Sequence, residues 1–507
     1  MKNKMITPFN YMVLCSNLWI MNNTRKVALN TAAQFVGKII GLAISLATIA
    51  IIFRFLGVEG VGKYTTSFAF VAFFALFADL GLGWTMLREL AIEKDQNKVF
   101  NNIFTMRLIL GILVFVIAAL VVWLFKYPAE VKLAVVVLSV AYFFQSLVSV
   151  AVSIYLNKYR MDIAVGAEVV GKAIVLAVIY FLSRSGGTLM EVMYAYVAGC
   201  LVNFLIVWIY ANKFISVGLA FDWKYWRHAT SLALPIGVTL VFGFIYYKID
   251  SIMLSLLKSM TDVGIYGTAY KILEVLQMFP ALFLGAAFTL ITSYVTTKDA
   301  RLQSAFQKQF DFLALLAAPI VAGTLVLAGQ IIGFIAGSKG DFISASTLTF
   351  AGHAITSVTC LRILILSVGI SFFTTLYSFM IVSLGKQKQM VWPTVGFAAF
   401  NFLINLYLIP RYSYLGAAFA TLVTEIIVFS TVRYIVKSNV SLSVSFGNFA
   451  KIILCAIFMS GATYALYLAG IGLILNLVIS VVVYALLAYG LQVISRDLLK
   501  SVLKIGD

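Results

Sequence analysis

Residues 103–125 read IFTMRLILGILVFVIAALVVWLF, and their only charged side chain, Arg107, lies near one end. A helix that crosses the hydrocarbon core of a bilayer needs about 20 apolar residues, so this run has the length of one membrane span. Within hydrocarbon every backbone N–H and C=O must find a partner inside the segment, and a helix achieves this for a single run. Only 7 prolines occur among the 507 residues, which favours long helices over barrel strands. The run therefore predicts an all-α integral membrane protein.

Runs of this kind recur along the whole chain. They cover residues 27–53, 64–85, 103–125, 132–156, 161–183, 190–212, 229–257, 264–295, 311–336, 358–384, 390–409, 413–436, 449–469 and 471–493. We therefore expect about 14 transmembrane helices. Residues 337–357 interrupt the pattern because they are polar and rich in Gly, Ser and Thr, which predicts a long external loop with a short amphipathic piece.

Composition also indicates a membrane protein. Hydrophobic residues make up 62% of the chain and charged residues 11%, against roughly 45–50% and 25% in a soluble domain. In a soluble protein the net charge of +18 would indicate nucleic-acid binding, but here Lys and Arg lie mostly in short loops between apolar runs. Alternate loops differ in Lys and Arg content by about three to one, which predicts that both termini are cytoplasmic. We expect a multi-pass protein of the cytoplasmic membrane with no nucleic-acid partner.

Few residues of the chain suit metal binding or catalysis. The four cysteines, which form no CxxC pair, are Cys15, Cys200, Cys360 and Cys455. The two histidines, His228 and His353, are too few for an ordinary metal site, so we expect no metal and no cofactor. No loop exceeds roughly 25 residues and we find no acidic cluster in the loops, so the protein is not expected to be an enzyme.

The N-terminal segment, residues 1–26, is expected to lie in the cytoplasm. The apolar stretch Tyr11–Met21 is too short to span a bilayer and has no clear small-residue cleavage site, which argues against a signal peptide. Two interpretations remain open: an interfacial anchor, or sequence upstream of a start at Met21, because Arg25 and Lys26 already supply the cytoplasmic flank.

A short motif recurs at matching places in the chain. Val61-Gly62-Lys63-Tyr64 opens the second run, and Val263-Gly264-Ile265-Tyr266 opens the eighth, 202 residues later. Six spans separate the two copies, so both halves would have the same membrane orientation, as in transporters built from parallel repeats. We therefore predict an N-lobe over residues 27–212 and a C-lobe over 229–436. Two further helices follow over 449–493, and a cytoplasmic tail over 494–507.

Ionisable side chains inside apolar runs are candidate binding residues. Each costs roughly 2.5–3.5 kcal/mol on insertion scales and usually faces a wet cavity or a partner. The candidates are Lys38, Asp79, Glu168, Lys172, Lys248, Asp250, Lys271, Glu274 and Glu425. An embedded group of lysines would attract an anion, and phosphate is the obvious one.

Two of the candidate pairs share a helix face. Glu168 and Lys172 are four residues apart, and Lys271 and Glu274 are three apart. Each pair is either part of a binding site or a self-neutralising pair that lowers the cost of insertion.

The other candidates lack a partner close in the sequence. Lys248 and Asp250 are two residues apart and point to different sides of a helix, so at least one needs a partner on another helix or in water. Lys38 lies near the middle of the first run with no acid nearby, which favours a cavity-lining role. For Asp79, at a predicted cytoplasmic end, a capping role is nearly as well supported. For Glu425 the alternative is a buried hydrogen bond to a neighbouring helix.

Short motifs follow one another in order between about Val27 and Lys437. In the first half they are Phe55-Leu56-Gly57, Gly60-Val61-Gly62-Lys63-Tyr64, Asp79-Leu80-Gly81-Leu82-Gly83 and Arg88-Glu89-Leu90-Ala91. In the second half they are Asp250-Ser251-Ile252-Met253-Leu254, Val263-Gly264-Ile265-Tyr266, Leu361-Arg362-Ile363-Leu364, Leu384-Gly385-Lys386, Ile409-Pro410 and Leu415-Gly416-Ala417-Ala418. On these motifs the chain resembles the polysaccharide (lipid-linked oligosaccharide) flippases of the multidrug/oligosaccharidyl-lipid/polysaccharide exporter superfamily.

The resemblance implies two six-helix lobes around a central cavity, with two extra helices. It implies a flippase that moves polyprenyl-pyrophosphate-linked oligosaccharide or polysaccharide repeat units across the membrane by alternating access, with H+ or Na+ left open as a coupling ion. Glycosyltransferases or a polymerase of the same pathway are the implied partners. Asp79, Arg88, Asp250 and Arg362 lie in the matching motifs, so Arg88 and Arg362 join the candidate binding residues.

Two other functions compete with this interpretation. The first is a drug antiporter of the same superfamily, in which Asp79, Asp250 or Glu425 would carry a proton or a sodium ion. The second is a membrane polymerase or glycosyltransferase that acts on the same lipids, although such enzymes usually need a large loop or an acidic cluster at the surface.

Overall fold

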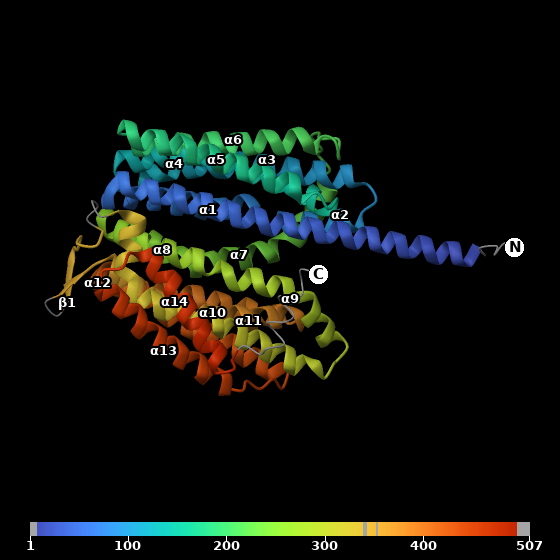
Figure 1. Ribbon diagram of the computed structural model, residues 1–507. Helices are drawn as coiled ribbons and strands as arrows, with labels where there is room; N and C mark the ends of the chain where they lie inside the picture. Colours follow the sequence, from blue (N-terminus) through green and yellow to red (C-terminus); the bar gives the residue numbers. More distant parts are fainter. Residues whose placement is uncertain (1–7, 338–341, 351–352, 494–507) are drawn as a thin grey trace. The chain divides into compact units, whose positions relative to one another are not determined.

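The computed structural model describes residues 8–337, 342–350 and 353–493 of the chain (Figure 1). The predicted tail, 494–507, lies outside the described residues, as do residues 1–7 of the predicted N-terminal segment. The helices are α1 Pro8–Asp79, α2 Leu82–Ile92, α3 Gln96–Val121, α4 Ala129–Asn157, α5 Met161–Ser185, α6 Leu189–Ala211, α7 Trp223–Leu257, α8 Met260–Leu276, α9 Met278–Thr296, α10 Arg301–Ala336, α11 Ser357–Ser383, α12 Val391–Asn439, α13 Gly447–Leu468 and α14 Leu473–Gly490. Two 3-10 turns, η1 Val122–Leu124 and η2 Gln387–Met390, and two strands, β1 Leu348–Phe350 and β2 His353–Ile355, complete the fold.

The predicted all-α membrane fold is confirmed. Among the described residues, 11 helices are long and apolar enough to cross a membrane, or 12 if the bent pair Met260–Gly285 and Ala287–Thr296 forms one span. The protein is therefore a multi-pass membrane protein, while the count of 14 spans is not confirmed and stays a prediction.

Two of these helices contain a break in their backbone. The segment Ala33–Ile92 has 60 residues, which as one straight helix would be about 90 Å long, against about 30 Å for the hydrocarbon core. Gly57 interrupts α1 with φ 68° and ψ 179°, and Ser413 interrupts α12 with φ 45° after Pro410. Gly57 falls between two apolar runs of the sequence and Ser413 is the first residue of one, and each long helix holds enough residues for two spans.

The described chain forms two compact units. Unit 1 contains α1 up to Ile49 and then Phe70–Val241, whereas unit 2 contains Ala50–Ala69 and the chain from Phe242 onward. Two helices, α1 and α7, therefore begin in unit 1 and contribute residues to unit 2. The lobe boundaries predicted from the sequence remain a prediction.

Within unit 1, helices α3, α4, α5 and α6 pack side by side (Figure 1). Helices α5 and α6 approach each other at Gly171 and Gly199, where a Cβ atom on either glycine would lie 2.7 or 2.8 Å from the carbonyl oxygen of the other. Small residues at such crossings allow the close backbone contact on which helix association in membranes depends.

Within unit 2, α11 packs on α12 and α10 packs on α13 (Figure 1). The predicted external loop contains an antiparallel hairpin in which Leu348 pairs with Ile355, a structure that the sequence did not predict. Side chains hold this loop to three helices: Phe342 stacks on Phe53 of α1, Thr347 bonds Asp262 of α8, and the Tyr414 hydroxyl of α12 donates to the Ile355 carbonyl.

The repeated motif forms a reciprocal contact inside unit 2. A Cβ atom on Gly62 would lie 1.7 Å from the Met260 carbonyl oxygen, and one on Gly264 would lie 1.9 Å from the Val58 carbonyl oxygen. Residues 58 and 260 are separated by 202 positions, as are 62 and 264. Each copy therefore packs its glycine on the equivalent backbone group of the other, which supports the internal repeat and explains why both copies need Gly there.

Candidate functional site

Three predicted binding residues meet in unit 2 and form what we call the lysine–glutamate triad: Lys248 on α7, with Lys271 and Glu274 on α8. The Lys271 Nζ lies 2.7 Å from Glu274 Oε2, and Lys248 Nζ contacts Glu274 Oε1. The side chains are 20% exposed for Lys248 and Glu274 and 37% exposed for Lys271. One carboxylate between two ammonium groups leaves a formal charge of plus one.

Tyrosines place the Lys248 ammonium group. Its Nζ lies 4.5 Å from the centre of the Tyr270 ring and 5.6 Å from that of Tyr247, a cation–π arrangement. The Tyr270 hydroxyl in turn donates to the Tyr247 carbonyl, which ties α8 to α7. The self-neutralising interpretation of Lys271 and Glu274 therefore accounts for only part of the group, because Lys248 adds a second cation.

Asp250 lies two residues beyond Lys248 and is buried among hydroxyl groups. Its Oδ2 accepts from the Tyr266 hydroxyl and, at 3.1 Å, from Thr421 Oγ1, while Oδ1 accepts from the Ser251 N–H at 2.6 Å. The sequence analysis expected a partner on another helix, or water, for at least one of Lys248 and Asp250; in the structure Lys248 contacts Glu274 of α8, and Asp250 has partners on α8 and α12.

Glu425 on α12 is also buried and hydrogen-bonded to neighbouring helices. The Tyr246 hydroxyl of α7 donates to its Oε2 at 2.5 Å, and Thr374 Oγ1 of α11 donates to its Oε1 at 2.6 Å. The sequence analysis gave a buried hydrogen bond as one alternative for Glu425 but did not name these partners.

Unit 1 holds a second group of predicted residues. Lys172 Nζ lies 2.6 Å from Glu168 Oε1 on α5, as the spacing predicts, and both side chains are partly exposed. Helix α1 approaches α5 through Gly37 and Gly41: a Cβ on Gly37 would lie 1.8 Å from Val165, and one on Gly41 would lie 3.2 Å from Lys172 Nζ. Gly41 thus leaves the space that the Lys172 ammonium group occupies.

Lys38, between these glycines, is exposed on α1. Among the described residues no ion pair engages it, and its predicted role in lining a cavity remains a prediction. Arg88 is likewise exposed, at the end of α2. Arg362 on α11 is exposed and its Nε donates to the Leu325 carbonyl of α10 at 3.2 Å.

Asp79 is engaged elsewhere in unit 1. It forms an ion pair with Arg107 of α3, and its Oδ1 also accepts from the Gly83 N–H at 3.2 Å, just after the turn that contains Gly81 at φ 82°. Arg107 is 3% exposed and donates to the Ser146 carbonyl at 3.2 Å. The sequence shows only that Arg107 lies near the end of a span. It does not show the ion pair, because the partner, Asp79, lies in another helix. Within unit 1, Asp79 is therefore paired with Arg107, and Glu168 is paired with Lys172.

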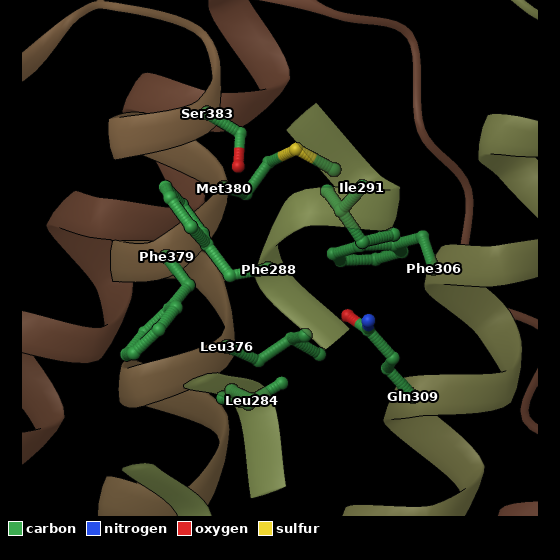
Figure 2. Close-up of a pocket in the computed structure, with 9 residues that line it drawn as sticks. All are labelled: Leu284, Phe288, Ile291, Phe306, Gln309, Leu376, Phe379, Met380 and Ser383. Atoms are coloured by element: carbon green, nitrogen blue, oxygen red, sulfur yellow. The ribbon is translucent and has the colours of Figure 1, made fainter. Parts of the chain in front are cut away.

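The cavities of unit 2 differ in what they can hold. A pocket between α9, α10 and α11, where Gln309 and Ser383 lie among aromatic and aliphatic side chains, has a volume of about 10 Å3 and holds no more than a water molecule (Figure 2). A groove of about 750 Å3 lies between α10, α11, α12 and α13, and its lining contains no charged residue. Such a lining suits hydrocarbon rather than a phosphate group, so the triad is the better candidate for an anion.

Comparison with known proteins agrees with this architecture. The profile of the family described as polysaccharide biosynthesis protein matches residues 24–295. A protein of Haloferax volcanii described as probable low-salt glycan biosynthesis flippase Agl15 is 20% identical over 488 residues, which cover 94% of this chain and 99% of that protein.

Solved transporter structures share the fold. The lipid II flippase MurJ in an inward closed conformation superposes with a TM-score of 0.71 at 15% identity, covering 93% of this chain and 100% of that chain. An inward-facing multidrug resistance transporter of the MATE family superposes with a TM-score of 0.62 at 15% identity, covering 78% and 95%. At these identities the likeness shows the fold alone. Since the family profile spans more than half of the residues, the chain belongs to the polysaccharide biosynthesis protein family, as its motifs predicted.

Proposed function

We propose that this protein is a flippase that moves a lipid-linked glycan across the cytoplasmic membrane for polysaccharide biosynthesis. The substrate we expect is a polyprenyl-pyrophosphate-linked oligosaccharide or repeat unit, carried by alternating access. Membership of the polysaccharide biosynthesis protein family supports this, as does the likeness along nearly the whole chain to a protein described as a probable glycan biosynthesis flippase. The proteins that it resembles are flippases and transporters, not enzymes.

The observation that carries the proposal is the lysine–glutamate triad. Two lysines share one carboxylate, and all three side chains are partly exposed, so the group has positive charge to spare. A pyrophosphate group can take the place of Glu274 at Lys248 while Glu274 keeps its bond to Lys271. Charge-assisted hydrogen bonds of this kind are worth about 1.5–3 kcal/mol each, which suits a substrate that must bind and then leave.

Unit 1 supplies a second set of cations in this proposal. Lys172 is partly exposed beside Gly41, and Lys38 is exposed on the same helix as Gly41. We propose that both line a surface of unit 1 that can bind an anionic group. Cytoplasmic termini and contacts with glycosyltransferases or a polymerase of the pathway belong to the same proposal.

Leaflet-specific labelling of a lipid-linked sugar in reconstituted vesicles tests the proposal. The variants K248A and K271A are expected to slow the appearance of the sugar in the outer leaflet. K248A removes the phosphate ligand, and K271A removes the lysine that holds Glu274 when the phosphate takes its place at Lys248. The matched control is K132A, because Lys132 lies over the Trp123 ring outside the triad. A wild-type rate in the double variant K38A/K248A, with normal amounts of protein in the membrane, would remove the site assignment.

One observation favours a second candidate, a cation-coupled drug antiporter. Asp250 and Glu425 are buried carboxylates whose contacts are hydroxyl groups and one backbone N–H, the type of oxygen-rich setting in which a proton or sodium ion could be carried. Loss of drug efflux in D250N with intact glycan transport would favour this antiporter. Loss of glycan transport without any drug efflux in the wild type would exclude it.

A further inference from the structure

The linker between α6 and α7 is held along α3 by a row of side chains. Asn101 makes two bonds to it: its Nδ2 donates to the Ser216 carbonyl at 3.0 Å, and its Oδ1 accepts from the Gly218 N–H at 2.9 Å. Asn97 Oδ1 accepts from the Ser216 N–H at 3.1 Å, and Thr105 Oγ1 accepts from the Ala220 N–H at 3.0 Å. The backbone groups of the linker therefore form hydrogen bonds with side chains of α3 and not with a neighbouring strand.

The row continues into the first turn of α7. Asn102 Oδ1 accepts from the Asp222 N–H and from the Trp226 indole N–H, both at 3.0 Å. Lys98 Nζ adds an ion pair to Asp222 at 2.8 Å. The end of the linker and the start of α7 are therefore both fixed to α3.

The match between helix and linker has a geometric basis. Asn97, Asn101 and Thr105 are four residues apart on α3, a rise of about 6 Å per step. The bonded linker residues 216, 218 and 220 are two apart in an extended chain, a step of about 6.6 Å. Because the two repeats nearly coincide, one face of a helix can bond alternate residues of an extended segment. At the intervening positions, Val217 is partly buried against the core of unit 1 and Leu219 is exposed.

The same device occurs in unit 2, at the equivalent place in the repeat. Gln303 on α10 donates to the Ser443 carbonyl at 2.6 Å and accepts from the Ser443 N–H at 3.1 Å. Gln307 does the same with Ser445, at 3.1 and 2.9 Å. Gln303 and Gln307 lie 202 positions after Asn101 and Thr105, and they hold the linker that follows α12.

We propose that these two rows of side chains, which we call the linker ladders, are positioning devices. The first ladder fixes the start of α7 to α3 and so sets the direction of α7. Helix α7 belongs to unit 1 up to Val241 and to unit 2 from Phe242, where it carries Lys248 and Asp250. A loose linker would let the start of α7 drift. A linker fixed at alternate residues leaves little slack at the start of α7, the helix that also carries Lys248.

Close backbone contacts in unit 1 add to this support. A Cβ on Gly237 of α7 would lie 2.5 Å from the Leu80 carbonyl oxygen, and one on Gly81 would lie 2.5 Å from the Ala233 carbonyl oxygen. The first part of α7 is therefore hydrogen-bonded at its start by the first ladder, and farther along it packs closely on the turn between α1 and α2. Asn101, Asn102 and Thr105 act on the lysine–glutamate triad only through α7.

Hydrogen exchange of the full-length protein in nanodiscs tests the ladders directly. In the wild type we expect slow exchange at Gly218 and Ala220, although the linker is neither helix nor sheet. The variant N101L/T105V is expected to raise exchange over residues 215–222, by about tenfold for each lost bond of ordinary strength. The control T296V removes a hydroxyl that bonds only the Thr292 carbonyl of its own helix and should leave that segment unchanged. Q303L/Q307L should likewise raise hydrogen exchange over residues 442–446.

Transport in vesicles supplies the second readout, which rests on the proposed function. N101L/T105V is expected to slow glycan transport at least about fivefold with head-group binding retained, since the triad itself is intact. Should that variant misfold, N101D keeps the acceptor for the Gly218 N–H and loses the bond to the Ser216 carbonyl, so an intermediate effect is expected. If hydrogen exchange were unchanged in the variants, the hydrogen bonds of the linker ladders would be refuted. If exchange were faster but transport kept its wild-type rate, the positioning role of the ladders would be refuted. A wild type that moves no glycan would refute the proposed flippase while leaving the exchange result valid.

Discussion

The reciprocal glycine contact in unit 2 allows a sharp test of the internal repeat. In G62A the new methyl group would lie 1.7 Å from the Met260 carbonyl oxygen, and in G264A it would lie 1.9 Å from the Val58 carbonyl oxygen. Real contacts of this type are almost never under 3.0 Å, so the two backbones must separate by at least 1.1–1.3 Å. Overpacking in a close-packed interior usually costs about 1–3 kcal/mol, and here the obstacle is backbone, which cannot rotate away. We therefore expect each variant to lose about 3 kcal/mol of stability.

The assay is thermal unfolding of purified protein in one detergent, with Tm as the readout. Because the two contacts are reciprocal, G62A and G264A should lower Tm by similar amounts. The control G461A places a methyl group on α13, where no atom lies within 4 Å, and should leave Tm unchanged or raise it slightly, since Ala favours a helix over Gly by up to about 1 kcal/mol. If either glycine variant had the Tm of G461A, the close crossing described here would be refuted.

Three further predictions concern other parts of the chain. D79N should lower stability by about 3 kcal/mol in denaturant unfolding, because Arg107 would keep a buried charge without its partner, and the double variant D79N/R107M should recover part of the loss. G41A should slow glycan transport without a change in Tm, because its methyl group would press on Lys172 Nζ at 3.2 Å, whereas G396A, in open space, should alter neither. The hydrogen bond from Lys98 lowers the pKa of Asp222 below its ordinary value of 3.8, so the pair stabilises the fold above that pH. The Tm difference between the wild type and D222N should therefore be present at neutral pH and disappear as the pH falls below the pKa of Asp222; a difference that persisted there would contradict the assignment.

Contacts within one helix were predictable from the sequence, and contacts between helices were not. The pairs Glu168–Lys172 and Lys271–Glu274 follow from spacing alone, and both are formed. The partner of Lys248 is 26 residues away, and finding it requires knowing how α7 and α8 are rotated about their axes. A soluble helix reveals that rotation through its apolar stripe, but a helix in lipid is apolar on every side.

The helix breaks and the linkers also include features that the sequence predicts and features that it does not. The sequence analysis separated the apolar runs 27–53 and 64–85, and the structure has its break at Gly57, between them. By contrast, the β1–β2 hairpin has strands of only three residues, too short for a pattern to register. The spacing of Asn97, Asn101 and Thr105 is visible in the sequence, but their partners are backbone groups, which carry no sequence signal.

The exchange of segments between the units limits how the chain can be divided. A cut in the linker after α6 separates two fragments of comparable length. The first fragment would lack the part of α7 that completes unit 1, and the second would lack residues 50–69, which belong to unit 2. Neither fragment would then contain a whole folding unit. Co-expression of both fragments in one membrane should be required for either to escape proteolysis, in contrast to proteins whose duplicated halves fold independently.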